Sequence, residues 1–550
     1  MKTSEHSRTK SQHGSTVRGL LRPLAGATLI AVAQASVAGQ FATDDPDLQI
    51  RWDNTLRYNL GVRVEQIDPE IRDSVDGPKS DTKFGRGDIN SNRIDVLSEF
   101  DVQYKRSTGV RVSAAAWYDQ AYHDTTGYTN FIKRYNAGPY GEVLDAFAFT
   151  SMDIGDMSAS FKAGRHNIFW GEAFFTNANS VAYSQGPLDI RKALANPGIE
   201  IKELFLPLNQ ISSQLRMTDE LTFAGQYFLQ WQPSRLPDGG TYFGSGDFAT
   251  QGGGTMALPW VSFSGIGTHP KDRGDWGLAA FWSPQALDGK LGFYVRRFGE
   301  KLPWLTATAP IFTPTLAPNP TDAQFSYASD TRLYGVSLGK NMGGFALGAE
   351  LSYRENTALY SSAFAPTTEG ARGNTWHGLV NGLWLLGKAG PVWDSAVLIA
   401  ELSFSHLDKV TKNAAFYRGV GTAACTGASQ LPDSGDKFDD CTTRTGVGIS
   451  LNFQPKWFQV APGVDLTAPM SYSVGVWGND PGLGGNRQGS GSWSAGLSAD
   501  INTVYQVSLT YSDYLNRDRT NGTSAVTTAN SLSTLYNDRG WLALTFKTAF

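Results

Sequence analysis

Residues 335–339 read G-V-S-L-G and match the G-x-S-x-G pattern of a serine nucleophile. That chemistry requires a sharp turn between a strand and a helix. Here the pentapeptide continues a strand pattern and runs into a hairpin-turn sequence, K-N-M-G-G. We therefore interpret its glycines as relief of crowding within a strand.

No other catalytic pattern is present in the sequence. H-E-x-x-H, Walker A and Rossmann glycine patterns are missing, and the 7 histidines are scattered. The sequence therefore predicts a protein that is not an enzyme and that uses no cofactor or metal.

A second group of candidate residues is charged and occupies every other position of strand-like runs. Apolar residues occupy the positions between them. One face of each strand is therefore apolar and the other is polar. If these side chains line the lumen of a pore, their charges would determine which solutes can pass. The candidates are Arg51, Arg57, Arg93, Asp95, Glu99 and Arg111.

The segment 167–209 is the most distinctive stretch without a strand pattern, and segments of this length are usually functional. It mixes aromatic residues with charges, and its candidate residues are Trp170, Glu172, Asp189, Arg191, Lys192, Glu200 and Lys202. One hypothesis is that it folds inward and forms a constriction with the strand charges. The alternative is an external lid without a role in selectivity.

Cys425 and Cys441 are the only cysteines and belong to one long loop. In an oxidising compartment they are expected to pair and to have a structural role. Four acidic residues beside them, Asp433, Asp436, Asp439 and Asp440, lack EF-hand spacing. We interpret them as a solvated acidic loop, with a surface cation site as the alternative.

The elements that position these residues are strands with a period of two. Residues 50–64 form the clearest run, long enough for a tilted strand to cross a membrane, which takes about 9 to 11 residues. The pattern predicts about 16 to 18 strands. The candidates lie near 50–65, 90–105, 109–122, 143–151, 157–166, 210–217, 220–231, 275–283, 290–298, 331–340, 344–355, 373–387, 392–407, 443–453, 467–477, 490–501, 504–514 and 539–550.

The connections between these strands alternate between short turns and long loops. Short periplasmic turns and long extracellular loops are typical of a transmembrane antiparallel β-barrel. The predicted fold class is therefore all-β, with residues 39–550 forming one barrel domain. A propeller or solenoid would show a repeat of about 20 to 50 residues, and the sequence has none.

The composition agrees with a barrel and excludes other classes. Aromatic residues make up 12%, there are 60 glycines, and the net charge is −4. A nucleic-acid binder would carry a basic surface, so no nucleic-acid partner is expected. No run reaches the roughly 18 apolar residues of a transmembrane helix.

The two ends of the chain indicate where the protein resides. A basic stretch, a short apolar run and small residues before Ala38 predict a signal peptide, residues 1–38, cleaved near Ala38. The last residues, W-L-A-L-T-F-K-T-A-F, form an alternating strand ending at Phe550. It must pair with the strand near residue 50 to close the barrel, since open edges are not tolerated in lipid. The expected location is the bacterial outer membrane, with outer-membrane lipid and the barrel assembly machinery as partners.

Several stretches resemble the proteobacterial outer-membrane family catalogued as domain of unknown function 1302. They include R-W-D-N-T-L-R-Y-N-L-G-V-R-V, A-G-R-H-N-I-F-W-G-E-A-F-F and P-G-I-E-I-K-E-L-F-L-P-L-N-Q. The resemblance implies an outer-membrane barrel that moves hydrophobic or lipid-like compounds. It further implies a periplasmic partner and an inner-membrane efflux-type transporter, and it supplies no catalytic residues.

The leading functional hypothesis is a transport barrel, either a channel or a conduit. The alternatives are a structural or adhesive barrel that displays its loops, and an outer-membrane enzyme. A conductance measurement separates transport from both alternatives.

Overall fold

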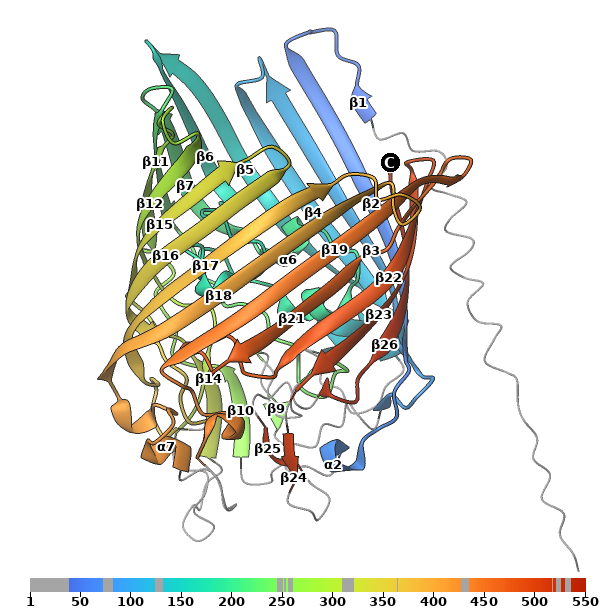
Figure 1. Ribbon diagram of the computed structural model, residues 1–550. Coiled ribbons are helices and arrows are strands. Elements are labelled where there is room, and N and C mark those ends of the chain that lie inside the picture. The colour runs from blue at the N-terminus through green and yellow to red at the C-terminus, as the bar shows by residue number, and fades with distance from the viewer. Residues whose placement is uncertain are drawn as a thin grey trace, which may run out of the picture.

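One closed antiparallel barrel accounts for most of the chain (Figure 1). The computed structural model describes residues 39–72, 83–123, 132–244, 251, 254–255, 261–308, 321–363, 365–426, 435–516, 518–520, 526–529 and 536–550. The barrel built by these residues has 18 wall strands, which confirms the predicted fold class. The predicted signal peptide, residues 1–38, lies outside the described residues.

Each predicted strand corresponds to one strand of the wall. In the order in which they pair, the wall strands are β2 (Leu48–Arg63), β3 (Ile89–Tyr104), β4 (Thr108–Asp119), β5 (Tyr140–Ile154), β6 (Met157–His166), β7 (Leu208–Arg216), β8 (Leu221–Phe228), β11 (Trp276–Trp282), β12 (Gly289–Phe298), β15 (Thr331–Asn341), β16 (Phe345–Ala358), β17 (Arg372–Leu386), β18 (Ser395–Lys412), β19 (Thr445–Ala461), β20 (Val464–Thr467) with β21 (Met470–Trp477), β22 (Gly491–Ile501), β23 (Tyr505–Leu515) and β26 (Trp541–Ala549). β20 and β21 both lie between β19 and β22 and form one wall strand. They are separated at Pro469, which has no N–H to donate to a sheet.

The last strand closes the barrel on the first, as the sequence predicted. β26 pairs antiparallel with β2, placing Leu544 opposite Leu60. The N–H of Asn54 donates to the carbonyl of Phe550 (2.8 Å), and the N–H of Phe550 donates back (2.9 Å). Closure leaves the wall without the unpaired edge that lipid does not tolerate. The chain ends beside the short turns, at the top of Figure 1.

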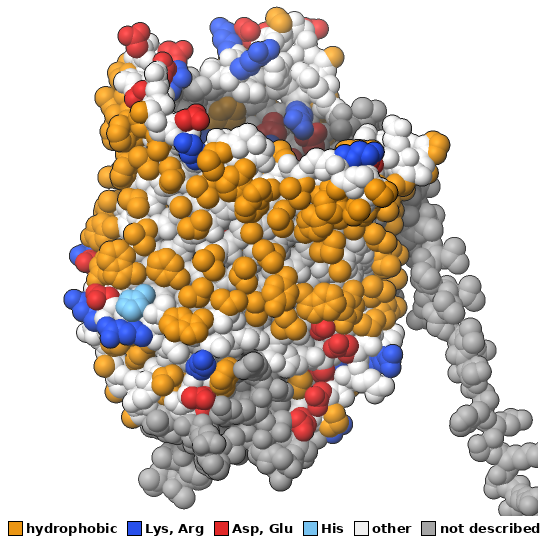
Figure 2. Space-filling view, viewed as in Figure 1, with side chains coloured by type: hydrophobic (Ala, Val, Ile, Leu, Met, Phe, Trp, Pro, Cys, Tyr) orange, Lys and Arg blue, Asp and Glu red, His pale blue; other side chains and the backbone are white. Residues whose placement is uncertain are grey.

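The two faces of each wall strand differ as the alternation predicts. On β3, Val96 and Phe100 are on the outer surface, whereas Asp95 and Glu99 are buried inside the barrel. Such outward side chains form a broad apolar belt on the outside of the barrel, and Figure 2 shows one side of it. At the short-turn end the same view is hollowed, and charged side chains are visible inside. The wall therefore presents an oily surface to lipid and a polar one to the lumen.

The long loops lie at the opposite end and contain most of the remaining elements. Loop strands β9 (Gly254–Thr255), β10 (Val261–Ile266), β13 (Trp304–Ala307) and β14 (Thr321–Ser326) form a four-stranded sheet, and β24 (Asp518–Thr520) pairs with β25 (Val526–Ala529). The short helices of these loops are α2 (Pro69–Arg72), η2 (Gln120–Tyr122), η3 (Lys133–Ala137), η5 (Ala414–Phe416), α7 (Ala423–Thr426) and η6 (Lys437–Asp439). β1 (Gly39–Phe41) pairs with the start of β2 at the short-turn end. None of the helices in the described ranges is long and apolar enough to span a membrane.

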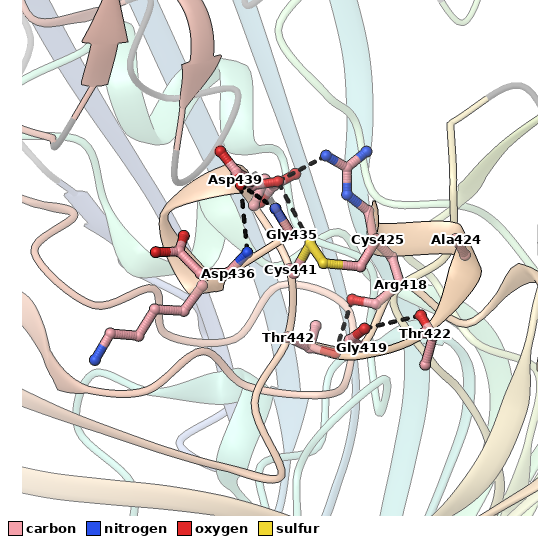
Figure 3. Close-up of a disulfide and its surroundings, with 12 residues drawn as sticks. Arg418, Gly419, Thr422, Ala424, Cys425, Gly435, Asp436, Asp439, Cys441 and Thr442 are labelled. Atoms are coloured by element: carbon pink, nitrogen blue, oxygen red, sulfur yellow. Dashed lines mark hydrogen bonds between the residues drawn. A yellow bond between two sulfur atoms is a disulfide. The ribbon is translucent and has the colours of Figure 1, made fainter. Parts of the chain in front are cut away.

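Cys425 and Cys441 form a disulfide in the loop between β18 and β19 (Figure 3). Both cysteines are fully buried, and the guanidinium of Arg418 donates to the carbonyl of Asp439 beside them (2.7 Å). The carboxylates of Asp436 and Asp439 cap η6. Across the described ranges no group of His, Cys, Asp and Glu is arranged to hold a metal ion.

Replacing Cys425 by serine is expected to speed tryptic cleavage of this loop without lowering the urea midpoint of the barrel. A cross-link closing about 15 residues contributes about 3 kcal/mol in the chain-entropy model, and its loss acts on the loop alone. Limited proteolysis followed by mass spectrometry measures the effect, with the disulfide-bonded wild type as the control. Equal cleavage of the two proteins would contradict the prediction.

Candidate functional site

The segment between β6 and β7, residues 167–207, lies inside the barrel and is termed the lumen segment. It bonds to β16, β17 and β18 on one side of the wall and to β2, β3, β5 and β26 on the opposite side. Its helices are η4 (Asn177–Asn179), α5 (Ile190–Ala195) and α6 (Ile201–Leu204), and α6 is visible between the wall strands in Figure 1. Asp189 caps α5 by accepting from the N–H of Lys192 (3.1 Å), and the sequence N-P-G ends that helix.

Two wall carboxylates hold one turn of the lumen segment by its backbone. Glu350 on β16 accepts hydrogen bonds from the N–H groups of Ala173 (3.0 Å) and Val181 (2.7 Å). Glu401 on β18 accepts from Phe174 (2.7 Å) and from neighbouring N–H groups of the same turn. A carboxylate with several N–H donors makes strong, charge-assisted hydrogen bonds. This turn is therefore fixed to the wall.

The same turn requires a glycine at position 171. Gly171 has φ +87°, and a Cβ there would collide with the carboxylate of Glu350 and with Val181. Trp170, just before it, is buried and packs against Tyr294 of β12, with ring centroids 5.9 Å apart.

Two buried arginines bind carbonyl groups of the lumen segment further along. Arg296 on β12 donates to the carbonyls of Val181 (2.7 Å) and Tyr183 (2.8 Å). Arg354 on β16 donates to the carbonyl of Ser180 (2.9 Å), and its guanidinium lies 4.0 Å from the centre of the Tyr183 ring. The wall thus holds this part of the segment through both its N–H and its carbonyl groups.

On the opposite side, the lumen segment is held by ion pairs. Glu142 on β5 pairs with Lys192 (2.7 Å) and Arg235 (2.6 Å). Asp189 pairs with Arg235 (2.9 Å) and Arg191 (3.3 Å). These charges are largely buried, and Glu142, Asp189 and Arg235 each have two partners, so removal of one charge weakens the cluster without leaving all of its neighbours unpaired.

The pKa values of two acids in this cluster move in opposite directions. Burial alone would raise the pKa of Asp189, but Arg191, Arg235 and Lys192 outweigh it and hold that pKa well below its usual value. Asp238 lies 3.5 Å from Arg191, yet burial dominates and raises its pKa. Of these two acids, Asp189 is therefore the one whose ionised form the neighbouring cations favour.

A second ionic group joins α6 to β2 and β3. Arg57 pairs with Glu203 (3.0 Å) and lies 3.6 Å from Asp95, which also pairs with Arg93 (2.8 Å). All four side chains are nearly fully buried. This group fixes α6 against the wall.

Other residues predicted from the sequence also meet in the lumen. Lys202 pairs with Glu99, and Glu200 pairs with Lys547 of the last strand. Arg111 lies 3.9 Å from Glu99.

Two predicted residues are placed less centrally. Glu172 lies 3.4 Å from Lys290, near the start of β12. Arg51 makes its ion pair with Asp53 (2.6 Å), near the short-turn end, and its side chain is 65% exposed. Arg51 therefore lies apart from the lumen segment.

Several residues that hold the lumen segment were missed by reasoning from the sequence. They are Glu142, Arg235, Arg296, Glu350, Arg354 and Glu401. The sequence does contain a signal for Glu350 and Glu401. The motif A-E-L-S followed by an aromatic residue occurs at 349–353 and again at 400–404. Both runs put a lone acid on the lumen face of an apolar strand.

Ser337, the serine of the G-x-S-x-G match, lies within β15. Its hydroxyl is 2.9 Å from that of Tyr294 in the wall. The strand-to-helix turn of a serine nucleophile is not formed here.

The two larger cavities that the described residues form beside the lumen segment lie next to each other. The external cavity, about 610 Å³, lies between the segment and the long loops and is bordered by residues such as Leu236, Trp304 and Phe325. The inner cavity, about 130 Å³, is bordered by residues of the segment itself, with no other described residue in its lining. Phe175, Asn177 and Gly186 border both cavities, and Phe175 has the largest side chain of the three.

A closed antiparallel barrel with an apolar outer belt and a polar, ion-paired interior is the architecture of a transmembrane β-barrel protein. The chain belongs to the family described as Protein of unknown function (DUF1302), whose model matches residues 20–550. This membership confirms the resemblance seen in the sequence. No curated protein sequence matches the chain significantly.

Three solved structures illustrate the proteins to which the backbone of this chain is similar. OccAB4 of Acinetobacter baumannii is 9% identical, with 94% of this chain and 100% of that chain covered and a TM-score of 0.42. OccD3 (OpdP) of Pseudomonas aeruginosa is 11% identical, with 93% of each chain covered and a TM-score of 0.39. The outer membrane channel DcaP of Acinetobacter baumannii is 9% identical, with 94% and 100% covered and a TM-score of 0.37.

Proposed function

We propose that this chain is a channel or conduit of the bacterial outer membrane, and that the lumen segment narrows its pore. The observation that carries the proposal is the attachment of this segment to opposite sides of the wall, by Glu350 and Glu401 on one side and by Glu142 on the other. An 18-stranded barrel without such a segment encloses a wide aqueous lumen. A fixed segment across that lumen is a means of selecting what passes.

The solutes proposed are small molecules, including hydrophobic or lipid-like compounds. The largely apolar lining of the external cavity supports this class. Transfer onward by a periplasmic partner and an inner-membrane efflux-type transporter is part of the same proposal. The purified protein in a planar lipid bilayer tests it, and a barrel that never conducts would contradict the channel.

A non-transporting barrel that displays its loops is the second candidate. The four-stranded sheet β13-β14-β10-β9 and the disulfide among the long loops favour it, since they give the loop end a defined surface. The bilayer recording separates the two functions, because display requires no conductance.

Replacing both Glu350 and Glu401 by alanine is expected to raise the single-channel conductance by about twofold and to increase current noise, because one turn of the pore constriction is released. Single-channel recording measures the change. Glu355→Ala is the matched control, since this acid lies on β16 and pairs at 3.9 Å with Arg332, away from the lumen segment. An unchanged conductance in a folded double variant would contradict the narrowing role.

A further inference from the structure

The external cavity is apolar although charges fill much of the lumen. Leu188 of the lumen segment, Leu236, Leu302, Trp304 and Phe325 border it, together with hydroxyl-bearing side chains. The cavity volume of about 610 Å³ is within the range of small-molecule sites, about 300 to 1,000 Å³. By shape and lining it is suited to one small molecule.

No charged group of the described residues faces the interior of this cavity. Lys301 is the single charged residue among the described residues that border it. Its side chain is only 3% exposed, and the ammonium lies 3.3 Å from Asp275 and 5.3 Å from the centre of the Trp231 ring. Neither Asp275 nor Trp231 borders the cavity, so the ammonium points away from it. An ion entering this space would lose its hydration without gaining a partner.

Aromatic side chains lead from this cavity to the inner one. Phe169, Phe174 and Phe175 are 58%, 46% and 40% exposed, although they belong to a segment enclosed by the barrel. All three border the inner cavity, and Phe175 borders the external cavity as well. Exposed aromatic rings that are grouped in this way mark a surface that contacts an apolar ligand.

We propose that the external cavity binds one uncharged, apolar small molecule and that the Phe175 side chain is the gate through which it reaches the inner cavity. The proposal rests on the proposed transport function and names its substrate class and route. The ion-paired side of the lumen, around Glu142 and Arg57, is closed to this molecule because a buried ion pair offers it no favourable surface.

Binding is tested by protection of an introduced thiol in the full-length protein. Ala178→Cys and, in a second variant, Ala363→Cys place a thiol at the cavity, and both native cysteines are bonded to each other. The rate of alkylation by N-ethylmaleimide is measured with naphthalene, and with naphthalene-2-sulfonate as the matched charged probe. At about ten times its Kd, naphthalene is expected to slow alkylation about tenfold. The sulfonate is expected to have no effect.

Asp156→Cys, on the exposed turn between β5 and β6, is the control, and neither probe should protect it. The proposed binding site is overturned if naphthalene protects neither of the two cavity thiols. It is also overturned if the sulfonate protects them as well as naphthalene does. Protection in a barrel that never conducts supports the site and contradicts the channel, so the two proposals fail separately.

The gate is tested in planar bilayers with the Ala178→Cys protein. An uncharged methanethiosulfonate reagent is added on the short-turn side while the opposite compartment is perfused, and the rate of thiol modification is measured. Phe175→Ala is expected to raise that rate about tenfold, as for a gate whose closed state dominates by about ten to one. Ile201→Ala is the control, since this side chain is 66% exposed on the lumen segment but borders neither cavity. If the thiol is modified at the same rate with and without the Phe175→Ala substitution, the proposal that Phe175 is a gate is overturned.

Discussion

Deletion of residues 175–195, with a Gly-Ser linker joining Phe174 to Asn196, is expected to raise the single-channel conductance several-fold. The deleted residues include the gate, η4 and α5, and thus much of what crosses the lumen. The wall remains closed by β26 and β2. A barrel of about 18 strands then has space for an aqueous channel, so ions meet less resistance.

This deletion should not unfold the wall, because Glu142 and Arg235 keep each other as partners at 2.6 Å. Heat-modifiability on a gel checks folding before any recording. Glu355→Ala, recorded under the same conditions, shows the conductance of a barrel with an intact lumen segment. A folded deletion variant that conducts no better than this control would rule out the lumen segment as the constriction.

Asp189→Ala is expected to lower the free energy of unfolding by about 3 kcal/mol, the low end of the range for breaking a buried ion pair. The Asp189 side chain is fully buried, binds Arg191 and Arg235, and caps α5. The low end applies because Glu142 still pairs with Arg235 at 2.6 Å. Urea unfolding in lipid vesicles measures the loss. The half-exposed pair of Glu355 with Arg332 provides the control, since its removal costs less than about 1 kcal/mol.

The loss should depend on pH in a defined direction. The folded-state pKa of Asp189 lies below its unfolded value, so its contribution to stability is complete above the unfolded pKa of about 3.9. It disappears as the pH falls towards the folded pKa. The difference between wild type and Asp189→Ala should therefore be the same at pH 7 and pH 5 and should shrink in stronger acid. A difference that already vanished at pH 5 would show that Asp189 is not held ionised by its neighbours.

The wall of this protein was predictable strand by strand. Residues 50–64 and 90–105 alternate because each neighbouring side chain points to the opposite face, and that property is local. The pairing of the last strand with β2 was predictable as well, since lipid does not tolerate an open edge.

The candidate site was predictable only in part. Asp189, Arg191 and Lys192 were singled out because they stand in a long segment without a strand pattern, and the structure gathers them around Glu142. Glu350 and Glu401 were missed because each is one acid within an otherwise ordinary strand. Their partners in the chain are 178 and 227 positions away, as the contacts with Glu172 and Phe174 show.

The sequence by itself determined the closed barrel, its two faces and the charges available to its lumen, because strand alternation depends only on adjacent residues. The tertiary structure alone decided that residues 167–207 lie inside, which charges pair, and where an apolar cavity remains beside Phe175. Those outcomes depend on which wall strands face each other across the lumen. The curvature and closure of the whole barrel set which strands lie opposite each other, and no local pattern of residues encodes that arrangement.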